Sequence, residues 1–155
     1  MAPSHGTLSR CLRTAAAACL VPAAISCRAD SPPNEIAVIA SDYAFRAPDS
    51  VPAGPAILSF ENTGHVPDEM IFARIRDDVS NTAFADSLVR DARMITMRAT
   101  GSAVLFAAPG RRNQIVRLGV AFRRGERYAL WCRFQDSSGA PRHTALGMLK
   151  LLAVK

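Results

Sequence analysis

Three side chains that can bind a soft metal ion stand close together near the end of the chain. Cys132 supplies a thiol, His143 an imidazole and Met148 a thioether, and they surround one loop between two strand-like segments. Thiolate and thioether sulfur select copper(I), and imidazole suits copper as well. The residue types and their order therefore predict a metal site in this part of the chain.

A type 1 copper site needs one ligand more than these residues supply. Such a site places one cysteine thiolate and two histidine nitrogens around the metal, with a weak axial methionine. The second imidazole must come from further upstream, where the nearest histidine is His65, just after the Asn62–Gly64 turn segment. His65 is therefore a candidate ligand, although single histidines on turns are more often solvated.

Each candidate also has an explanation that needs no metal. Cys132 suits a small core position, because free cysteine is commonly buried. His143 suits a loop position where it forms hydrogen bonds, and Met148 suits a gap-filling core position at the start of a strand. The residue types alone leave both interpretations open.

The first 27 residues are predicted to be an export signal. Arg10 and Arg13 carry the only side-chain charges of residues 1–27, and they precede the apolar run Thr14–Ile25. A basic segment followed by a short apolar run and small residues is typical of such signals, and the run is too short to span a bilayer permanently.

The signal ends in Ala24-Ile-Ser-Cys27, which resembles a bacterial lipobox. Cys27 is therefore the predicted site of lipid modification, and residues 28–34 form a short tether before the domain at residues 35–155. In that case the protein is held at an envelope membrane or in the periplasm. Cleavage near Ala29 is the alternative, and it would give a soluble secreted protein.

The cysteine count supports a role for the remaining thiol. Cys11, Cys19 and Cys27 belong to the signal, so the predicted domain keeps Cys132 alone. A domain with one cysteine forms no internal disulfide, and a lone thiol outside the cytoplasm needs a reason. Metal binding is one reason, and burial as an inert core residue is the other.

The composition fits one globular domain with a moderately basic charge. A chain of 155 residues is long enough to bury a core, and it carries 19 Lys and Arg against 13 Asp and Glu. No nucleic-acid motif accompanies these cations, so we expect no nucleic-acid partner. The sequence also lacks a phosphate-binding glycine loop and any recognisable catalytic triad, so we expect no enzyme.

The hydrophobic pattern predicts an antiparallel β-sandwich with one short inserted helix. Phe84 and Leu88 recur at helical spacing within Asn81–Ala92. Alternation between Arg127 and Phe134 puts Cys132 on the apolar, inward face of a strand. The predicted strands are Glu35–Ala40, Tyr43–Phe45, Ala56–Glu61, Asp68–Ile75, Gly101–Phe106, Asn113–Phe122, Arg127–Phe134 and the segment that ends at Val154.

With these residues in hand, the domain resembles a cupredoxin, and it is most similar to the exported, often lipid-anchored cupredoxin-like proteins of bacteria. The resemblance covers roughly residues 35–154 and implies an all-β Greek-key sandwich of seven or eight strands, with the metal ligands in loops at one end. Its markers are Ser41–Pro48, Val51–Gly54, Phe60–Gly64, Tyr128-x3-Cys132 and Gly139-x3-His143-x3-Gly147-Met148.

The chain departs from this family at the first histidine ligand. The resemblance implies a histidine at the start of the strand after the Asn-x-Gly turn, and here Asp68 holds that position. A carboxylate oxygen is a harder donor than imidazole. His65 lies three residues earlier, and that shift moves a side chain roughly 10 Å and reverses its facing. Either residue completes the ligand set, or Asp68 pairs with Arg142 or His143.

Two functions follow from these patterns. The first is an exported copper-binding protein that carries copper or passes single electrons, with a redox or copper-exchange protein as its partner. The second is a metal-free cupredoxin-like module at the cell envelope, which binds a partner through the arginine-rich strand face around Arg117 and Arg123. The residue at position 68 is the feature that separates the two. Even without a fourth ligand, Cys132, His143 and Met148 could still hold copper(I), since thiolate and thioether select it.

Overall fold

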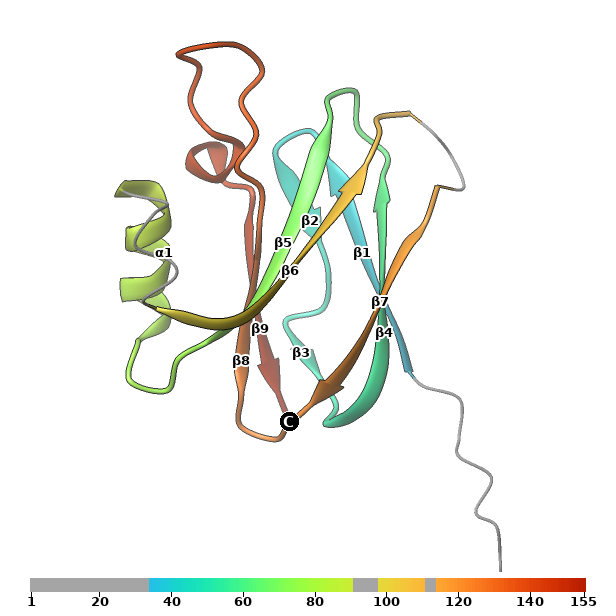
Figure 1. Ribbon diagram of the computed structural model, residues 1–155, viewed down its shortest axis with the longest axis vertical. Helices are drawn as coiled ribbons and strands as arrows, with labels where there is room; N and C mark the ends of the chain where they lie inside the picture. The colour runs from blue at the N-terminus through green and yellow to red at the C-terminus, as the bar shows by residue number, and fades with distance from the viewer. Residues whose placement is uncertain (1–33, 91–97, 111–113) are drawn as a thin grey trace, which may run out of the picture. The chain divides into compact units, whose positions relative to one another are not determined.

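The computed structural model describes residues 34–90, 98–110 and 114–155, most of which form β-strands (Figure 1). The strands are β1 (Asn34–Ser41), β2 (Ala44–Arg46), β3 (Ser50–Val51), β4 (Gly54–Asn62), β5 (Asp68–Ile75), β6 (Ala99–Ala107), β7 (Val116–Phe122), β8 (Arg127–Trp131) and β9 (Leu149–Val154). One α-helix, α1 (Asn81–Arg90), follows β5, and one 3₁₀ helix, η2 (His143–Leu146), precedes β9.

Several predicted features lie outside the described residues. They are the export signal with Cys27, the tether up to residue 33, the helix end at Ala92 and the strand start at Asn113. In the part of the chain that is described, no helix has the length and apolar character needed to cross a membrane.

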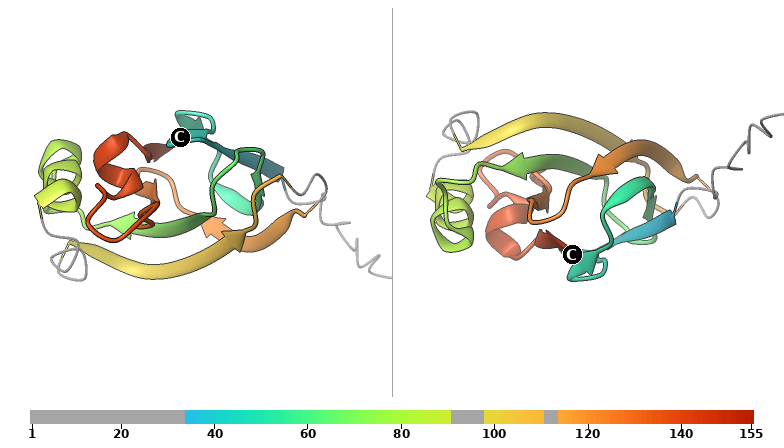
Figure 2. Two further views of the ribbon diagram at one scale, coloured as in Figure 1. Left: turned by 90° about the horizontal axis from the view of Figure 1, so that it is seen from above. Right: turned by 90° about the horizontal axis from the view of Figure 1, so that it is seen from below.

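The described strands form two sheets that pack face to face (Figure 2). One sheet has the order β2-β1-β4-β7 and the other the order β3-β9-β8-β5-β6. Their facing sides share one apolar core, to which β1, β4, β5 and β8 contribute Val38, Phe60, Met70 and Leu130. The prediction of a β-sandwich with one short helix is confirmed.

Strand direction and number differ in part from the sequence prediction. β1 runs parallel to β4, and β3 runs parallel to β9, whereas a wholly antiparallel sandwich was predicted. The two-residue strand β3 lies between two predicted turns, so the described residues hold nine strands rather than seven or eight. Alternation of side chains reports which face a residue occupies, and it carries no signal for the direction of the neighbouring strand.

The five-stranded sheet is covered on both faces. Asp68, Met70 and Phe72 of β5 face the other sheet, while Ile71 and Ala73 point to the opposite side. There α1 packs against the sheet in a second apolar cluster made by Ile71, Ala73, Ile75, Phe84, Leu88, Ala129 and Trp131. Because α1 covers the outer face, every residue of β5 except Arg74 is buried.

Three connections meet at one end of the sandwich: the β1–β2 turn, the β4–β5 turn and the long β8–β9 segment (Figure 1). The β4–β5 turn is held by the side chain of Asn62, which donates to Val66 O and accepts from Gly64 N–H. The Asp42 carboxylate of the β1–β2 turn accepts the His65 N–H at 2.7 Å. These bonds fix the path of the chain into Asp68.

Gly64 is the point at which these two turns come closest. A Cβ atom built on Gly64 would lie 2.6 Å from Asp42 Oδ1 and 2.9 Å from Asp42 N, both too close. A Cβ atom on Gly119, in the middle of β7, would meet nothing within 4 Å. The two glycines therefore give a matched pair of substitutions.

We predict that Gly64→Ala lowers the free energy of unfolding by about 1–3 kcal/mol, because the new methyl group overpacks the contact between the turns. Gly119→Ala should change it by less than about 0.5 kcal/mol, as expected for a surface position away from such contacts. Denaturant unfolding of both variants measures the difference. Equal stabilities for the two variants would contradict the close approach at Gly64.

Candidate metal centre

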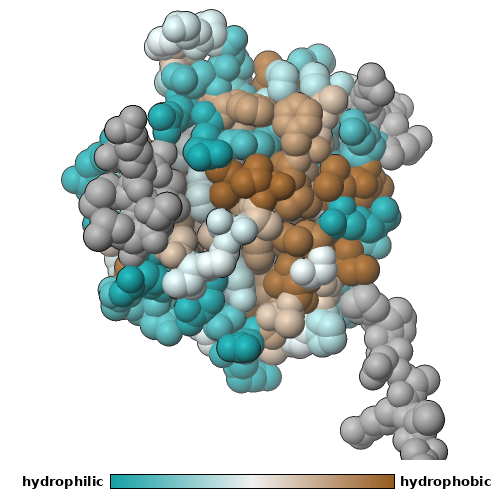
Figure 3. Space-filling view, viewed as in Figure 1, coloured by the Kyte–Doolittle hydropathy of each residue, from teal (hydrophilic) through white to brown (hydrophobic). Residues whose placement is uncertain are grey.

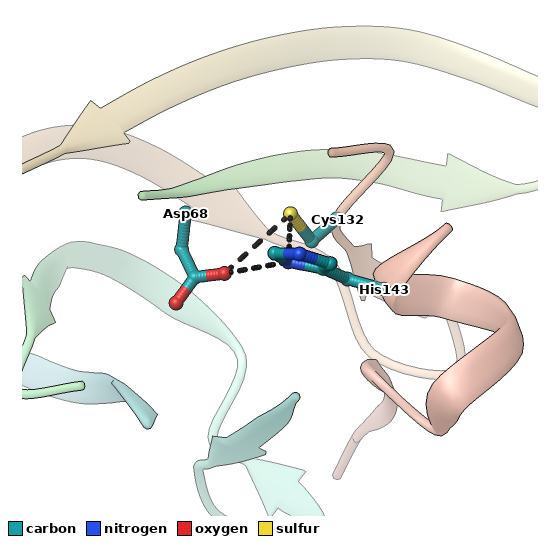
Figure 4. A group of neighbouring side chains, drawn as sticks. All are labelled: Asp68, Cys132 and His143. Atoms are coloured by element: carbon teal, nitrogen blue, oxygen red, sulfur yellow. Dashed lines mark hydrogen bonds and ion pairs between the residues drawn. The ribbon is translucent and has the colours of Figure 1, made fainter. Parts of the chain in front are cut away.

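Three buried side chains meet between the sheets: Asp68, Cys132 and His143 (Figure 4). Asp68 Oδ1 lies 3.0 Å from His143 Nδ1 and 3.7 Å from Cys132 Sγ. Cys132 Sγ lies 3.5 Å from the same nitrogen. The three possible ligand atoms all lie within 4.8 Å of one another, so one metal ion could contact all of them.

Strand pairing brings Asp68 and Cys132 together. β5 and β8 are antiparallel neighbours with Ile71 opposite Trp131, so the first residue of β5 and the residue after β8 meet at the same end of the sheet. Cys132 continues the inward face of Leu130, as the sequence predicted, and Asp68 shares the inward face of Met70.

Backbone hydrogen bonds seat His143 beside Cys132. The His143 N–H donates to Phe134 O at 2.8 Å, and the Thr144 N–H donates to Cys132 O at 3.1 Å. η2 then ends at Gly147, whose φ of 109° is readily adopted only by glycine. The loop is therefore tied to the thiol residue at several points and holds the imidazole in one place.

The structure places the two remaining candidate ligands differently. Met148 is fully buried in the core that contains Cys132, and its backbone bonds to both Cys132 and His143. The side chain of His65 is 92% exposed, and its Nδ1 atom lies 2.9 Å from the Asp42 carboxylate. The structure therefore joins Asp68 to Cys132 and His143, and leaves His65 outside this group.

A carboxylate on the outer side of His143 fixes the orientation of the ring. His143 Nε2 lies 3.0 Å from Asp136 Oδ1, and the Tyr43 hydroxyl donates to the other oxygen of Asp136. The hydrogen bonds from Tyr43 and then from His143 lower the pKa of Asp136, which is therefore an acceptor at neutral pH. A neutral imidazole thus carries its proton on Nε2 and turns the Nδ1 lone pair toward Asp68 and Cys132.

Burial makes protons or a cation necessary at the inner side of the ring. Desolvation raises the pKa of Asp68, although its hydrogen bond to His143 opposes the shift. Desolvation also raises the pKa of the Cys132 thiol to about 11. Asp68 Oδ2 is buried and has no hydrogen-bond partner within the described residues. An orphaned carboxylate oxygen at a buried site is well matched to a bound cation.

The donor set fits a metal of intermediate softness. A thiolate and an imidazole suit copper and zinc. Met148, whose backbone bonds to Cys132 and His143, is buried in the core that contains Cys132. The carboxylate oxygen suits zinc and other divalent ions better than it suits copper(I). The residues present therefore fit copper, with Asp68 as the departure from the usual ligand set.

The surroundings of Cys132 differ from those of an activated catalytic thiol. In space, Cys132 contacts His143 and His143 contacts Asp136. This thiol–imidazole–carboxylate series of contacts activates a nucleophile in some enzymes. A nucleophilic cysteine needs a lowered pKa and partial exposure, whereas Cys132 is fully buried with its pKa at about 11. A buried thiol of this kind is poorly suited to attack a substrate.

A shallow hollow of about 470 Å³ reaches the outer side of His143. Its lining includes Val66, Phe106, Phe134 and Asp136, and it does not include Cys132. Apolar side chains gather on one face of the molecule (Figure 3), and Val104 and Phe106 of β6 are more than half exposed. Access to the centre from this side therefore passes by the imidazole and not by the thiol.

Comparison with known proteins supports the fold. No family model matches the sequence, and no curated protein matches it significantly. The dithionite-reduced auracyanin of the photosynthetic bacterium Roseiflexus castenholzii is 16% identical with a TM-score of 0.52, and the match covers 79% of this chain and 97% of that chain. The protein has a cupredoxin fold.

Further solved structures are similar at lower scores. Auracyanin A of Chloroflexus aurantiacus, a "blue" copper protein, is 16% identical over 79% of this chain and 99% of its own, with a TM-score of 0.48. The azurin of Methylomonas sp. strain J is 14% identical over 79% of this chain and 98% of its own, with a TM-score of 0.45. Identities this low establish the fold alone.

The cupredoxin resemblance seen in the sequence is thus confirmed at the level of the fold. The sequence offered Arg142 and His143 as partners of Asp68, and the structure selects His143. Sequence reasoning missed Asp136 and Tyr43. Asp136 lies in the predicted surface loop only four residues after Cys132, and this proximity to the thiol was the one available signal.

We predict that Asp136→Ala releases the ring of His143. In the metal-free protein, ¹⁵N NMR should find the neutral ring protonated on Nε2, and Asp136→Ala should give a mixture of the two tautomers. Metal affinity should fall about 10–100-fold, because the carboxylate orients the ligand and raises its basicity. Asp49→Ala, which removes a surface carboxylate paired with Lys150, is the control. A wild-type ring protonated on Nδ1 would contradict this assignment.

Proposed function

We propose that this cupredoxin-fold protein binds copper with Asp68, Cys132 and His143, and that it carries copper or passes single electrons at the cell envelope. The observation that carries the proposal is the convergence of a carboxylate, a thiol and an imidazole at one buried point, with Asp68 Oδ2 left unpartnered. Copper is favoured because sulfur and imidazole donors suit it, and Met148, which is bonded through its backbone to Cys132 and His143, is a buried thioether close to them in the chain fold.

The likeness to auracyanin supports a redox or copper-handling role without establishing one. That neighbour was studied in a form reduced with dithionite. Electron transfer and copper carriage both need a metal held close to the surface on one side, and here the hollow beside His143 provides that side. A redox or copper-exchange protein would approach there.

The proposed location comes from the sequence. Arg10 and Arg13 with the apolar run Thr14–Ile25 favour export, and Cys27 is positioned for lipid modification. A lipid anchor on Cys27 followed by a short tether would keep the domain close to an envelope membrane. Secretion without an anchor is the alternative form of the proposal.

A metal-free binding module is the second candidate, and one observation favours it. A proton shared between Asp68 Oδ1 and His143 Nδ1 gives both atoms a hydrogen-bond partner. The fold therefore does not require a metal ion at Oδ1. The outward face of β6 would then be the binding surface, because Val104 and Phe106 are more than half exposed there. The arginine-rich face named in the sequence analysis is a separate surface, because Arg117 is exposed on β7, which belongs to the other sheet.

Copper titration tests the proposal. The full chain is prepared with the substitutions C11S, C19S and C27S, so that Cys132 is the one remaining thiol. We predict one copper ion per chain, measured by metal analysis and by competition with a chelator of known affinity, and loss of that binding in the Cys132→Ser variant. An intense thiolate-to-copper absorption band would favour electron transfer, and colourless binding of copper(I) would favour carriage. Absence of binding in both oxidation states would overturn the proposal and favour the metal-free module.

A further inference from the structure

We infer that Asp68 makes this centre selective for a divalent cation over copper(I). The inference rests on the proposed function, which it deepens by naming the charge of the ion that the site accepts. It is carried by the burial of three ligand groups whose two negative charges balance those of a divalent cation, and by the lack of another cation beside them among the described residues.

The three groups are removed from water. Asp68 and Cys132 have no exposed surface, and His143 is 1% exposed. When a metal is bound, Cys132 is a thiolate, Asp68 a carboxylate and His143 a neutral ring, because each must offer a lone pair. The ligand set then carries two negative charges. A divalent ion neutralises both, whereas copper(I) leaves one negative charge buried, which is costly in an interior.

No neighbouring cation corrects this balance within the described residues. The ion pair formed by Asp68 is the one with His143, whose Nδ1 atom would face the metal. The nearest ion pair along β5 is Glu69 with Arg133, where the arginine already serves another carboxylate. On the outer side of the ring stands Asp136, which adds negative charge. The surroundings therefore increase the preference for a doubly charged ion.

Donor chemistry points in the same direction. The unpartnered Asp68 Oδ2 and the nearby Oδ1 are hard oxygen donors, and hard oxygen donors suit divalent ions such as zinc(II) better than copper(I). A neutral imidazole at this position would supply neither the charge nor the oxygen. Asp68 is thus the residue that sets the specificity, while Cys132 and His143 supply affinity for either kind of ion.

Asp68→Asn tests the inference because it removes the charge and keeps the shape. Affinities for zinc(II), cobalt(II) and copper(I) are measured by chelator competition on the full chain carrying C11S, C19S and C27S. The ratio of zinc(II) to copper(I) affinity should fall at least tenfold in Asp68→Asn, and the ratio of cobalt(II) to copper(I) affinity should fall with it. A tenfold fall in the ratio of copper(II) to copper(I) affinity corresponds to a rise of 59 mV in the reduction potential of the bound copper.

Glu69→Gln is the matched control, since it removes one negative charge from the adjacent residue without removing a ligand. The ratio of zinc(II) to copper(I) affinity in Glu69→Gln should stay within threefold of the ratio in the unsubstituted protein. Asp68→His is a second variant with the same charge change and a different shape, and it should shift the ratio in the same direction as Asp68→Asn. Thermal melting of each variant verifies that it folds.

The outcomes separate this inference from the proposed function. Tight binding of copper(I) without binding of zinc(II) or cobalt(II) would overturn the inference and leave copper binding intact. Binding of zinc(II) and cobalt(II) without copper would support the inference and overturn the copper proposal. An unchanged ratio in Asp68→Asn and Asp68→His, or an equal shift in Glu69→Gln, would overturn the role given to Asp68.

Discussion

A carboxylate buried against a thiol and an imidazole is the constraint on which this molecule depends. Asp68, Cys132 and His143 meet in the interior, where an uncompensated charge is strongly unfavourable. The contact of 3.0 Å between Asp68 Oδ1 and His143 Nδ1 requires a proton or a cation between them. Desolvation favours the proton in the metal-free protein by raising the pKa of Asp68 and of the Cys132 thiol. Binding of a metal must therefore release protons from the site, which couples metal affinity to pH.

The rest of the fold serves to keep these groups in place. Pairing of β5 with β8 fixes Asp68 and Cys132 at one end of the sheet, and α1 covers the outer face of that sheet so that both strands are buried on two sides. The loop that carries His143 is tied back to Cys132 by backbone hydrogen bonds. Asp136 then holds the ring from outside. Groups held by these bonds would need little ordering to bind an ion.

The sequence revealed the parts of this arrangement that depend on local patterns. Alternation along β8 placed Cys132 on the inward face, and helical spacing of Phe84 and Leu88 located α1. The parallel pairing of β1 with β4 escaped prediction, because alternation does not encode strand direction. The bond from Tyr43 to Asp136 escaped it as well, since it joins residues 93 positions apart and depends on two turns that meet only in the folded chain.

Asp68, Cys132 and His143 are proposed to bind the same ion. X-ray absorption at the metal edge of the zinc(II)-loaded protein tests this proposal directly, because zinc avoids redox changes during the measurement. We predict one sulfur neighbour at about 2.3 Å together with nitrogen and oxygen neighbours at about 2.0–2.2 Å. A first shell of nitrogen and oxygen alone would show that the ion binds away from Cys132, and would contradict the account.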